Sequence, residues 1–146
     1  MQQKKWHRTI LFFTVLAGIC AGSSLVSLTG CSVEKTGGTK VCDLEYELVE
    51  EEELPAELKT AIEEKKAADF KMTQEKDGYL YVVRGYGEQE TGGYSIQILD
   101  FYLTDRAVVF DSGLLGPEQG SQKTSAPSYP YVVIRTKNPG KSVVFR

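Results

Sequence analysis

The sequence is poor in the residues that most often perform catalysis or bind transition metals. Its 146 residues include one histidine, His7, and one tryptophan, Trp6, and both lie within the first thirty residues. If that stretch is removed, no imidazole remains to act as a general base, to activate a serine or cysteine nucleophile, or to bind zinc. Catalysis and zinc sites that depend on histidine are therefore excluded for the rest of the chain, and we expect no metal and no cofactor.

Acidic residues are absent before Glu34, and the N-terminal stretch has the layout of a secretory signal. Three basic residues are followed by an apolar run that begins at Ile10. The run ends in a block that resembles the lipobox of bacterial lipoproteins, Leu28-Thr29-Gly30-Cys31. The resemblance implies that the Cys31 thiol receives a diacylglyceryl group and that cleavage then makes Cys31 the first residue of the mature protein.

An uncleaved signal anchor and ordinary secretion are the alternatives to lipidation. Residues 10–28 are just long enough to cross a bilayer core of about 30 Å. Glycine and serine make the second half of this run weakly apolar, which favours cleavage and lipidation. Two acyl chains hold a protein on a membrane, whereas one gives only marginal affinity. We therefore expect a lipid-anchored protein of the cell membrane or envelope that faces outside the cytoplasm.

Positive charge is also scarce after cleavage. The chain has 17 Lys+Arg and 20 Asp+Glu, and three of the basic residues lie in the signal, which leaves 14 against 20 and a net charge of −6. This balance gives no electrostatic reason to bind nucleic acid or anionic head groups. Cys42 is then the only free thiol, so it cannot form an intrachain disulfide. Its alternation with Val41 and Leu44 predicts a small buried side chain rather than a redox group.

The chain divides into a signal peptide at residues 1–30, a polar tether with the lipidated Cys31 at 31–40, and one domain at 41–146. Alternation over residues 41–49 predicts a half-buried strand. Four glutamates from Glu50 then precede Leu54-Pro55, where proline suits the first position of a helix, and helical spacing continues towards Phe70 and Lys71. The acidic run suggests calcium, but four consecutive glutamates cannot all face one ion, and a solvated helix entrance is favoured.

The remainder of the domain predicts β structure. The run at 79–86 is apolar on both faces, as in a central strand. Residues 94–103 shift phase near Leu99, which indicates a bulge. Further strands are expected at 107–110, 131–136 and 142–145, with an irregular section at 111–130 and a turn at Asn138-Pro139-Gly140. We expect an α+β fold in which a single amphipathic helix packs on an antiparallel β-sheet.

Two segments are candidate surfaces for a partner. The loop at 85–94 holds four glycines bracketed by two tyrosines, and it is longer than a minimal hairpin needs. The segment at 126–131 combines proline with tyrosine, and either Pro127 or Pro130 has a bond open to the cis form. A purely structural corner is the alternative for both segments. The candidate partner-binding residues are Tyr86, Glu88, Gln89, Thr91, Gly92, Gly93, Tyr94, Ser128 and Tyr129.

Several motifs taken together resemble the C-terminal domain of PrcB-type protease-complex subunits. They are Leu-Pro-x-Glu-Leu, Tyr-x-Tyr-x-x-x-Gly-Tyr-Gly-Glu-Gln, Thr-Gly-Gly-Tyr-Ser-Ile, Gly-Pro and Pro-Ser-Tyr-Pro-Tyr, spread over residues 41–146. The named family member is a lipoprotein that assists a secreted subtilisin-like protease complex. The resemblance implies a non-catalytic accessory role with a protein partner, such as a secreted protease.

Two other function classes remain open. The Thr-Gly-Gly-Tyr loop is distantly similar to the loops of chagasin-like cysteine-protease inhibitors, so the loop at 87–94 is a candidate inhibitory plug. An enzyme that uses carboxylates such as Glu88 with Asp100 or Asp111 is the other class, although no spacing singles out a catalytic pair. A membrane-anchored binding or assembly module is the leading hypothesis.

Overall fold

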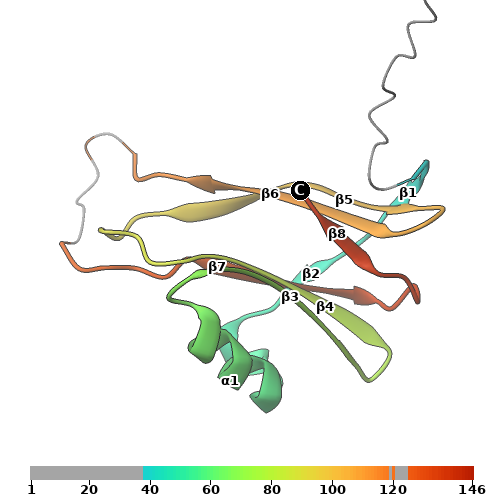
Figure 1. The fold of residues 1–146 in the computed structure, drawn as a ribbon, viewed down its shortest axis with the longest axis horizontal. Helices are drawn as coiled ribbons and strands as arrows, with labels where there is room; N and C mark the ends of the chain where they lie inside the picture. The colour runs from blue at the N-terminus through green and yellow to red at the C-terminus, as the bar shows by residue number, and fades with distance from the viewer. Residues whose placement is uncertain (1–37, 119, 121–124) are drawn as a thin grey trace, which may run out of the picture. The chain divides into compact units, whose positions relative to one another are not determined.

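The structure, a computed structural model, describes residues 38–118, 120 and 125–146. One α-helix and eight strands are present in these residues, which confirms the α+β class (Figure 1). The elements are β1 (Lys40–Asp43), β2 (Glu47–Leu48), the 3-10 helix η1 (Glu51–Glu53), α1 (Ala56–Lys65), β3 (Asp69–Lys76), β4 (Tyr79–Tyr86), β5 (Ser95–Thr104), β6 (Val108–Leu115), β7 (Tyr131–Lys137) and β8 (Val143–Phe145). No helix in the described part of the chain is long and apolar enough to cross a membrane.

The strands form two sheets of four rather than a single sheet. One has the order β1-β5-β6-β8 and the other has the order β2-β7-β4-β3. Every pairing is antiparallel except that of β8, which runs parallel to β6. The turn at 138–140 does not join a hairpin of β7 and β8, because it carries the chain from one sheet to the other.

A first core lies between α1 and the β2-β7-β4-β3 sheet. Leu58 and Ile62 of the helix, each 1% exposed, pack on Tyr81 and Val83 of β4 and on Val133 of β7. Burial of each such aliphatic side chain stabilises the fold by roughly 1.5–3 kcal/mol. The helix therefore covers one face of this sheet (Figure 1).

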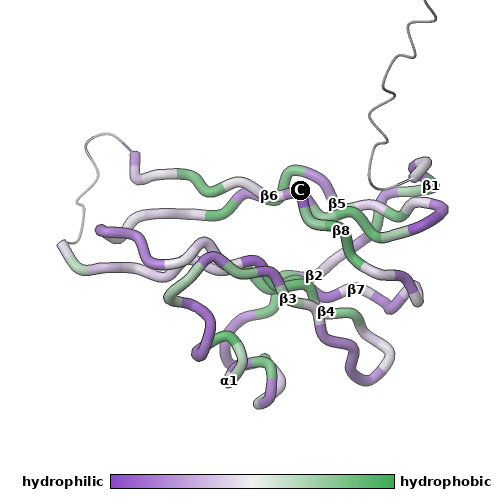
Figure 2. Tube along the Cα trace, viewed as in Figure 1, coloured by the Kyte–Doolittle hydropathy of each residue, from purple (hydrophilic) through white to green (hydrophobic). Residues whose placement is uncertain are grey.

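The opposite face of the same strands forms a second core against the other sheet. Leu80, Val82 and Ile134 pack with Phe101 of β5 and Phe110 of β6. The Phe101 and Phe110 rings meet edge to face with centroids 6.0 Å apart, which is a preferred aromatic geometry. Hydrophobic stretches lie along the strands, whereas the turns that join them are mostly hydrophilic (Figure 2). Because β4 contributes to both cores, its apolar character on both faces is explained.

The N-terminal part of the domain differs from the single strand expected at 41–49. The chain pairs with β5 as β1, crosses to the other sheet, and pairs with β7 as β2. Both are edge strands, so their side chains are exposed. Cys42 is exposed, and the expectation of a buried small side chain is wrong for it. Alternation predicts a buried face only where a second layer covers the strand.

The expected helix continues too far in the sequence. It ends at Lys65, and Phe70 and Lys71 belong to β3, which pairs along its whole length with β4. The turn between them is Asp77-Gly78, with φ of 52° and 79°. Asp-Gly is the strongest short-range signal for a hairpin of this kind. The Asp77-Gly78 turn therefore predicts β3 from the sequence, although the lysines that follow α1 continue a helix-like pattern.

Three local predictions are confirmed. Strand β4 has the expected bounds of 79–86. The β5–β6 register shifts between Ile98 and Asp100, at the expected bulge. Gly140 has φ 68° and donates its N–H to Asn138 Oδ1 at 2.8 Å, which forms the expected turn. The described residues contain no cis peptide bond, so Pro127 and Pro130 are both trans.

Candidate functional site

The loop at 87–94 connects β4 of one sheet to β5 of the other, so it is a crossover between layers rather than the end of a hairpin. The segment at 126–131 leads into β7, whose Tyr131 pairs with Gly85 of β4. Strand β4 ends where β7 begins. The two segments predicted as candidate surfaces are therefore brought together at one end of the molecule.

Direct hydrogen bonds join these two segments. Gln89 and Ser128 form an isolated antiparallel bridge, in which each N–H donates to the other carbonyl at 2.8 and 3.0 Å. The Ser128 hydroxyl donates to Thr91 O at 2.7 Å. Gln89 Nε2 donates to Tyr86 O at 3.0 Å. The loop is thus held by four residues that the sequence had marked separately.

A third contact fixes the loop to the end of α1. Glu88 N donates to Ala67 O at 3.2 Å. The preceding residue, Gly87, has φ 72°, and a Cβ there would lie 3.0 Å from backbone atoms of Ala68 and Asp69. Only glycine meets both conditions without strain. The close approach of the loop to the α1–β3 connection therefore explains the glycine at this position.

The exposed Glu88 and the half-buried Tyr129 form a pair of polar groups on the joined segments. The Tyr129 hydroxyl donates to Glu88 Oε2 at 2.9 Å, and this bond is the main reason that the pKa of Tyr129 is raised. The Lys66 ammonium lies 5.6 Å from the centre of the Tyr129 ring and 2.6 Å from Glu63. An aromatic face, a carboxylate and an ammonium are therefore offered side by side to solvent.

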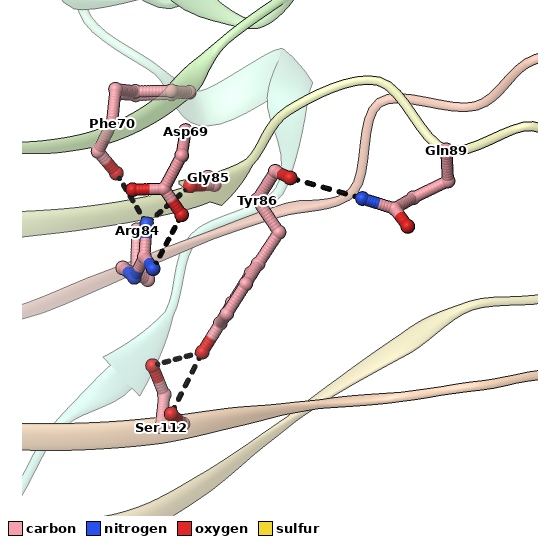
Figure 3. A network of polar contacts seen from close by, with 7 residues as sticks. All are labelled: Asp69, Phe70, Arg84, Gly85, Tyr86, Gln89 and Ser112. Carbon is pink, nitrogen blue, oxygen red and sulfur yellow. Dashed lines mark hydrogen bonds and ion pairs between the residues drawn. The ribbon is translucent and has the colours of Figure 1, made fainter.

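The Tyr86 side chain reaches from β4 of one sheet to Ser112 of β6 in the other sheet (Figure 3). Its hydroxyl donates to Ser112 O at 2.7 Å and lies 2.9 Å from Ser112 Oγ. The guanidinium of Arg84 packs on the Tyr86 ring at 4.1 Å. Tyr86 is thus a tie between β4 and β6, while its backbone carbonyl accepts from Gln89 and its N–H donates to Pro130 O at 3.0 Å.

Arg84 is a buried charge that sequence reasoning missed. It is 8% exposed, donates to the carbonyls of Phe70 and Gly85, and lies 2.7 Å from Asp69 Oδ2. That bond lowers the pKa of Asp69 below its usual value of 3.8. The signal was present, because Arg84 is the single charged residue in the apolar run of β4, and a buried charge needs partners.

The last part of the loop packs on the end of β6. Gly93 has φ 90°, and a Cβ there would lie 3.1 Å from the Pro117 side chain. Tyr94 is half-buried, and its ring lies 3.9 Å from the position of a Cβ on Gly116. Gly93 is exposed and Gly92 is half-buried. Residues 115–117 are therefore a third segment of the site, which the sequence analysis did not assign to it.

The comparisons with known proteins found a similarity that covers β4 to β7, the strands that position this site. Residues 80–137 match the model of the PrcB C-terminal family. Over these residues the chain is similar to the PrcB C-terminal family. The search of curated proteins and the search of solved structures gave no match.

The PrcB C-terminal match includes both segments of the site and the strands that position them. It runs from the second residue of β4 to the last residue of β7. Helix α1 and strands β1, β2, β3 and β8 lie outside the match, which is shorter than the expected resemblance over 41–146. The family segment thus supplies the inner strand pair of each sheet, β4–β7 and β5–β6.

The site has the features of a contact surface whose shape is fixed by backbone hydrogen bonds. No group of three or more His, Cys, Asp or Glu able to hold a metal occurs in the described residues. Asp100 and Asp111 are direct cross-strand partners on β5 and β6, whereas Glu88 is bonded to Tyr129. The three carboxylates named for the enzymatic alternative therefore lie in two separate places. Asp100 and Asp111 are on β5 and β6, and Glu88 is in the loop at 87–94.

A separate cleft of about 700 Å³ lies at the opposite end of β4 and β7 from the PrcB C-terminal site. It forms where the chain crosses between β1 and β2, and Tyr46, Tyr79 and Lys137 line it. Arg135 at its wall is bonded to Glu47 at 2.7 Å. None of the sequence-predicted site residues contributes to this cleft. Of the other predicted residues, Leu28, Thr29, Gly30 and Cys31 lie outside the described part of the chain.

Proposed function

We propose that the protein is a membrane-anchored lipoprotein that acts as a non-catalytic binding or assembly module, and that it serves as an accessory subunit of an exported protease complex. The family match supports a role like that of a protease-complex subunit. The observation that carries the proposal is the bonded pair of segments at 87–94 and 126–131. Their glycine- and proline-rich backbones are held in one arrangement before any partner arrives.

Such a surface suits protein binding for two physical reasons. Its loop is anchored by the Gln89–Ser128 bridge and by the bond from Glu88 N to Ala67 O, so little backbone entropy is lost on association. It also places the half-buried Tyr129 ring beside charged groups. Tyrosine is enriched in binding hot spots because it combines apolar area with a polar group.

The test is capture of a partner from membranes solubilised in detergent. The wild-type chain is expected to recover one protein in stoichiometric amount. Tyr129→Ala and Glu88→Lys are each expected to reduce the recovered amount at least about tenfold, as hot-spot changes do. Glu75→Lys is the matched control with the same change of charge, because Glu75 is exposed and pairs with Leu80, at the end of β4 far from the two segments.

Circular dichroism of each variant establishes that the fold is retained. If the wild-type chain recovers no protein above background, the binding role is wrong. If Glu75→Lys reduces recovery as much as Glu88→Lys does, a partner exists but binds elsewhere.

A further inference from the structure

Strand β6 is paired along its whole length on one side and along less than half of it on the other. Strand β5 pairs with it from Val108 to Leu115. Strand β8 pairs only with Val108, Val109 and Phe110. Within the described residues, no strand lies beside the remainder of β6 at 111–115 on the β8 side. This stretch is called the open edge below.

The direction of the backbone groups on the open edge follows from those that are bonded. Val108 N donates to Ser142 O, and Phe110 O accepts from Arg146 N, so both residues direct their backbone groups to the β8 side. Alternate residues along a strand point the same way. Ser112 and Leu114 therefore do so as well, and Ser112 O indeed accepts the Tyr86 hydroxyl from this side.

Three backbone groups remain for a further strand. They are Ser112 N–H, Leu114 N–H and Leu114 C=O, which have no partner among the described residues. Ser112 and Leu114 are half-buried and Leu115 is 47% exposed, so the edge is accessible from outside. A row of unpaired backbone groups is a template for strand addition.

The outer face beside the open edge has a definite chemical pattern. Asp111 stands at its start, paired directly with Asp100 of β5. Gly113 follows, with the exposed Leu99 side chain 3.7 Å from the position of its missing Cβ. Leu115 completes the row. An added strand would therefore meet two carboxylates at one outward position and apolar surface at the next two.

We propose that the open edge accepts an extended segment of the partner protein as an added strand, with a basic side chain facing Asp111 and apolar side chains facing Gly113 and Leu115. Backbone hydrogen bonds provide affinity in this mode, and alternate side chains provide specificity. The inference rests on the proposed binding function. A second copy of this chain is disfavoured as the occupant, because its own open edge at 111–115 has no basic residue to face Asp111.

The probe is the capped peptide Thr-Lys-Thr-Val-Thr-Val-Thr, whose lysine and valines occupy alternate positions, together with its reversed sequence, since either strand direction is open. The matched control has glutamate in place of the lysine. Each is titrated into the full-length chain in detergent micelles, and amide hydrogen exchange is followed by NMR. The lysine peptide is expected to slow exchange at Ser112 and Leu114 and to leave Gly113 unchanged, because Gly113 already faces β5.

Two variants make the test specific to the edge. Leu114→Pro removes one outward N–H while leaving the pairing with β5, and it is expected to abolish the protection at Ser112. Asp111→Lys preserves every backbone group and is expected to reverse the preference, so that the glutamate peptide binds roughly two- to fivefold tighter than the lysine peptide.

Unchanged exchange at both amides with every peptide, or a lysine preference that survives in Asp111→Lys, overturns the proposal. Self-association that Leu114→Pro removes, without peptide binding, also overturns it in favour of a second copy. If Leu114→Pro captures the membrane partner as well as the wild-type chain does, the added strand is wrong while the binding function stands. If a peptide slows exchange at these amides but no partner is captured, the open edge accepts a strand while the proposed binding function is wrong.

Discussion

Gly85 of β4 lies directly across from Phe70 of β3, on the face that α1 covers. A Cβ at this position would lie 2.0 Å from the Phe70 ring. The Phe70 ring therefore occupies the space that a side chain at Gly85 would fill. It also shields the backbone of Gly85, which has no side chain. Neither residue marks this contact in the sequence, since the two belong to different strands.

Gly85→Ala is expected to destabilise the protein by about 1–3 kcal/mol, because the methyl group forces Phe70 out of its place in a packed core. Chemical denaturation of the full-length chain in detergent measures the change in the free energy of unfolding. Gly113→Ala is the control, because its Cβ would lie 3.7 Å from the nearest side chain, an ordinary contact. Equal effects of the two substitutions would mean that strand propensity rather than the Phe70 contact decides the outcome.

Elements with strong local signals were predictable. Strand β4 has apolar residues on both faces, and Asn138-Pro139-Gly140 forms a turn through its own backbone preferences. The positions of the glycine loop and of the proline segment were equally clear. Each of these features depends on residues that are close in sequence, where propensity and pattern act directly.

Elements that depend on distant partners were not predictable. The division of 41–49 into β1 and β2 follows from pairing with β5 and β7, far along the chain. Burial of Cys42 was expected from alternation, but no second layer covers β1 there. The meeting of Gln89 with Ser128 follows from the pairing of β4 with β7, which are far apart in the sequence. Composition and spacing carry no record of such contacts.

The bond from Tyr86 to Ser112 is the element-scale contact that joins β4 to β6, and thus one sheet to the other. Tyr86→Phe removes this hydroxyl and leaves the ring on Arg84, so we expect a loss of about 1 kcal/mol in the free energy of unfolding. Tyr102→Phe is the control on β5, because its substitution removes a hydroxyl with no hydrogen bond to the described residues. Thermal denaturation followed by circular dichroism compares them. No difference between the two variants would show that water replaces the Ser112 contact.

At the scale of the whole molecule, the proposed lipid attachment at Cys31 would determine where the protein acts. Cys31→Ala is expected to abolish incorporation of a radiolabelled fatty acid and to leave the longer precursor uncleaved, because the thiol that accepts the diacylglyceryl group is gone. Labelling of cells followed by gel electrophoresis measures both. Cys42→Ala and Cys20→Ala are the matched controls and should be labelled as the wild type is. Label that persists in Cys31→Ala would rule out the lipobox assignment.

The placement of β4 between β3 and β7 has a consequence for how the chain folds. Strand β3 meets β4 through a two-residue turn, but β7 reaches β4 only after β5 and β6 of the other sheet have been passed in the sequence. Until residues 131–137 arrive, one edge of β4 is unpaired and the core beneath α1 lacks Val133. Long-range pairings of this kind slow folding, and they expose strand edges meanwhile. If the chain is exported as proposed, it would meet that delay outside the cytoplasm, and a partner that binds before β7 has paired would cover the exposed edge.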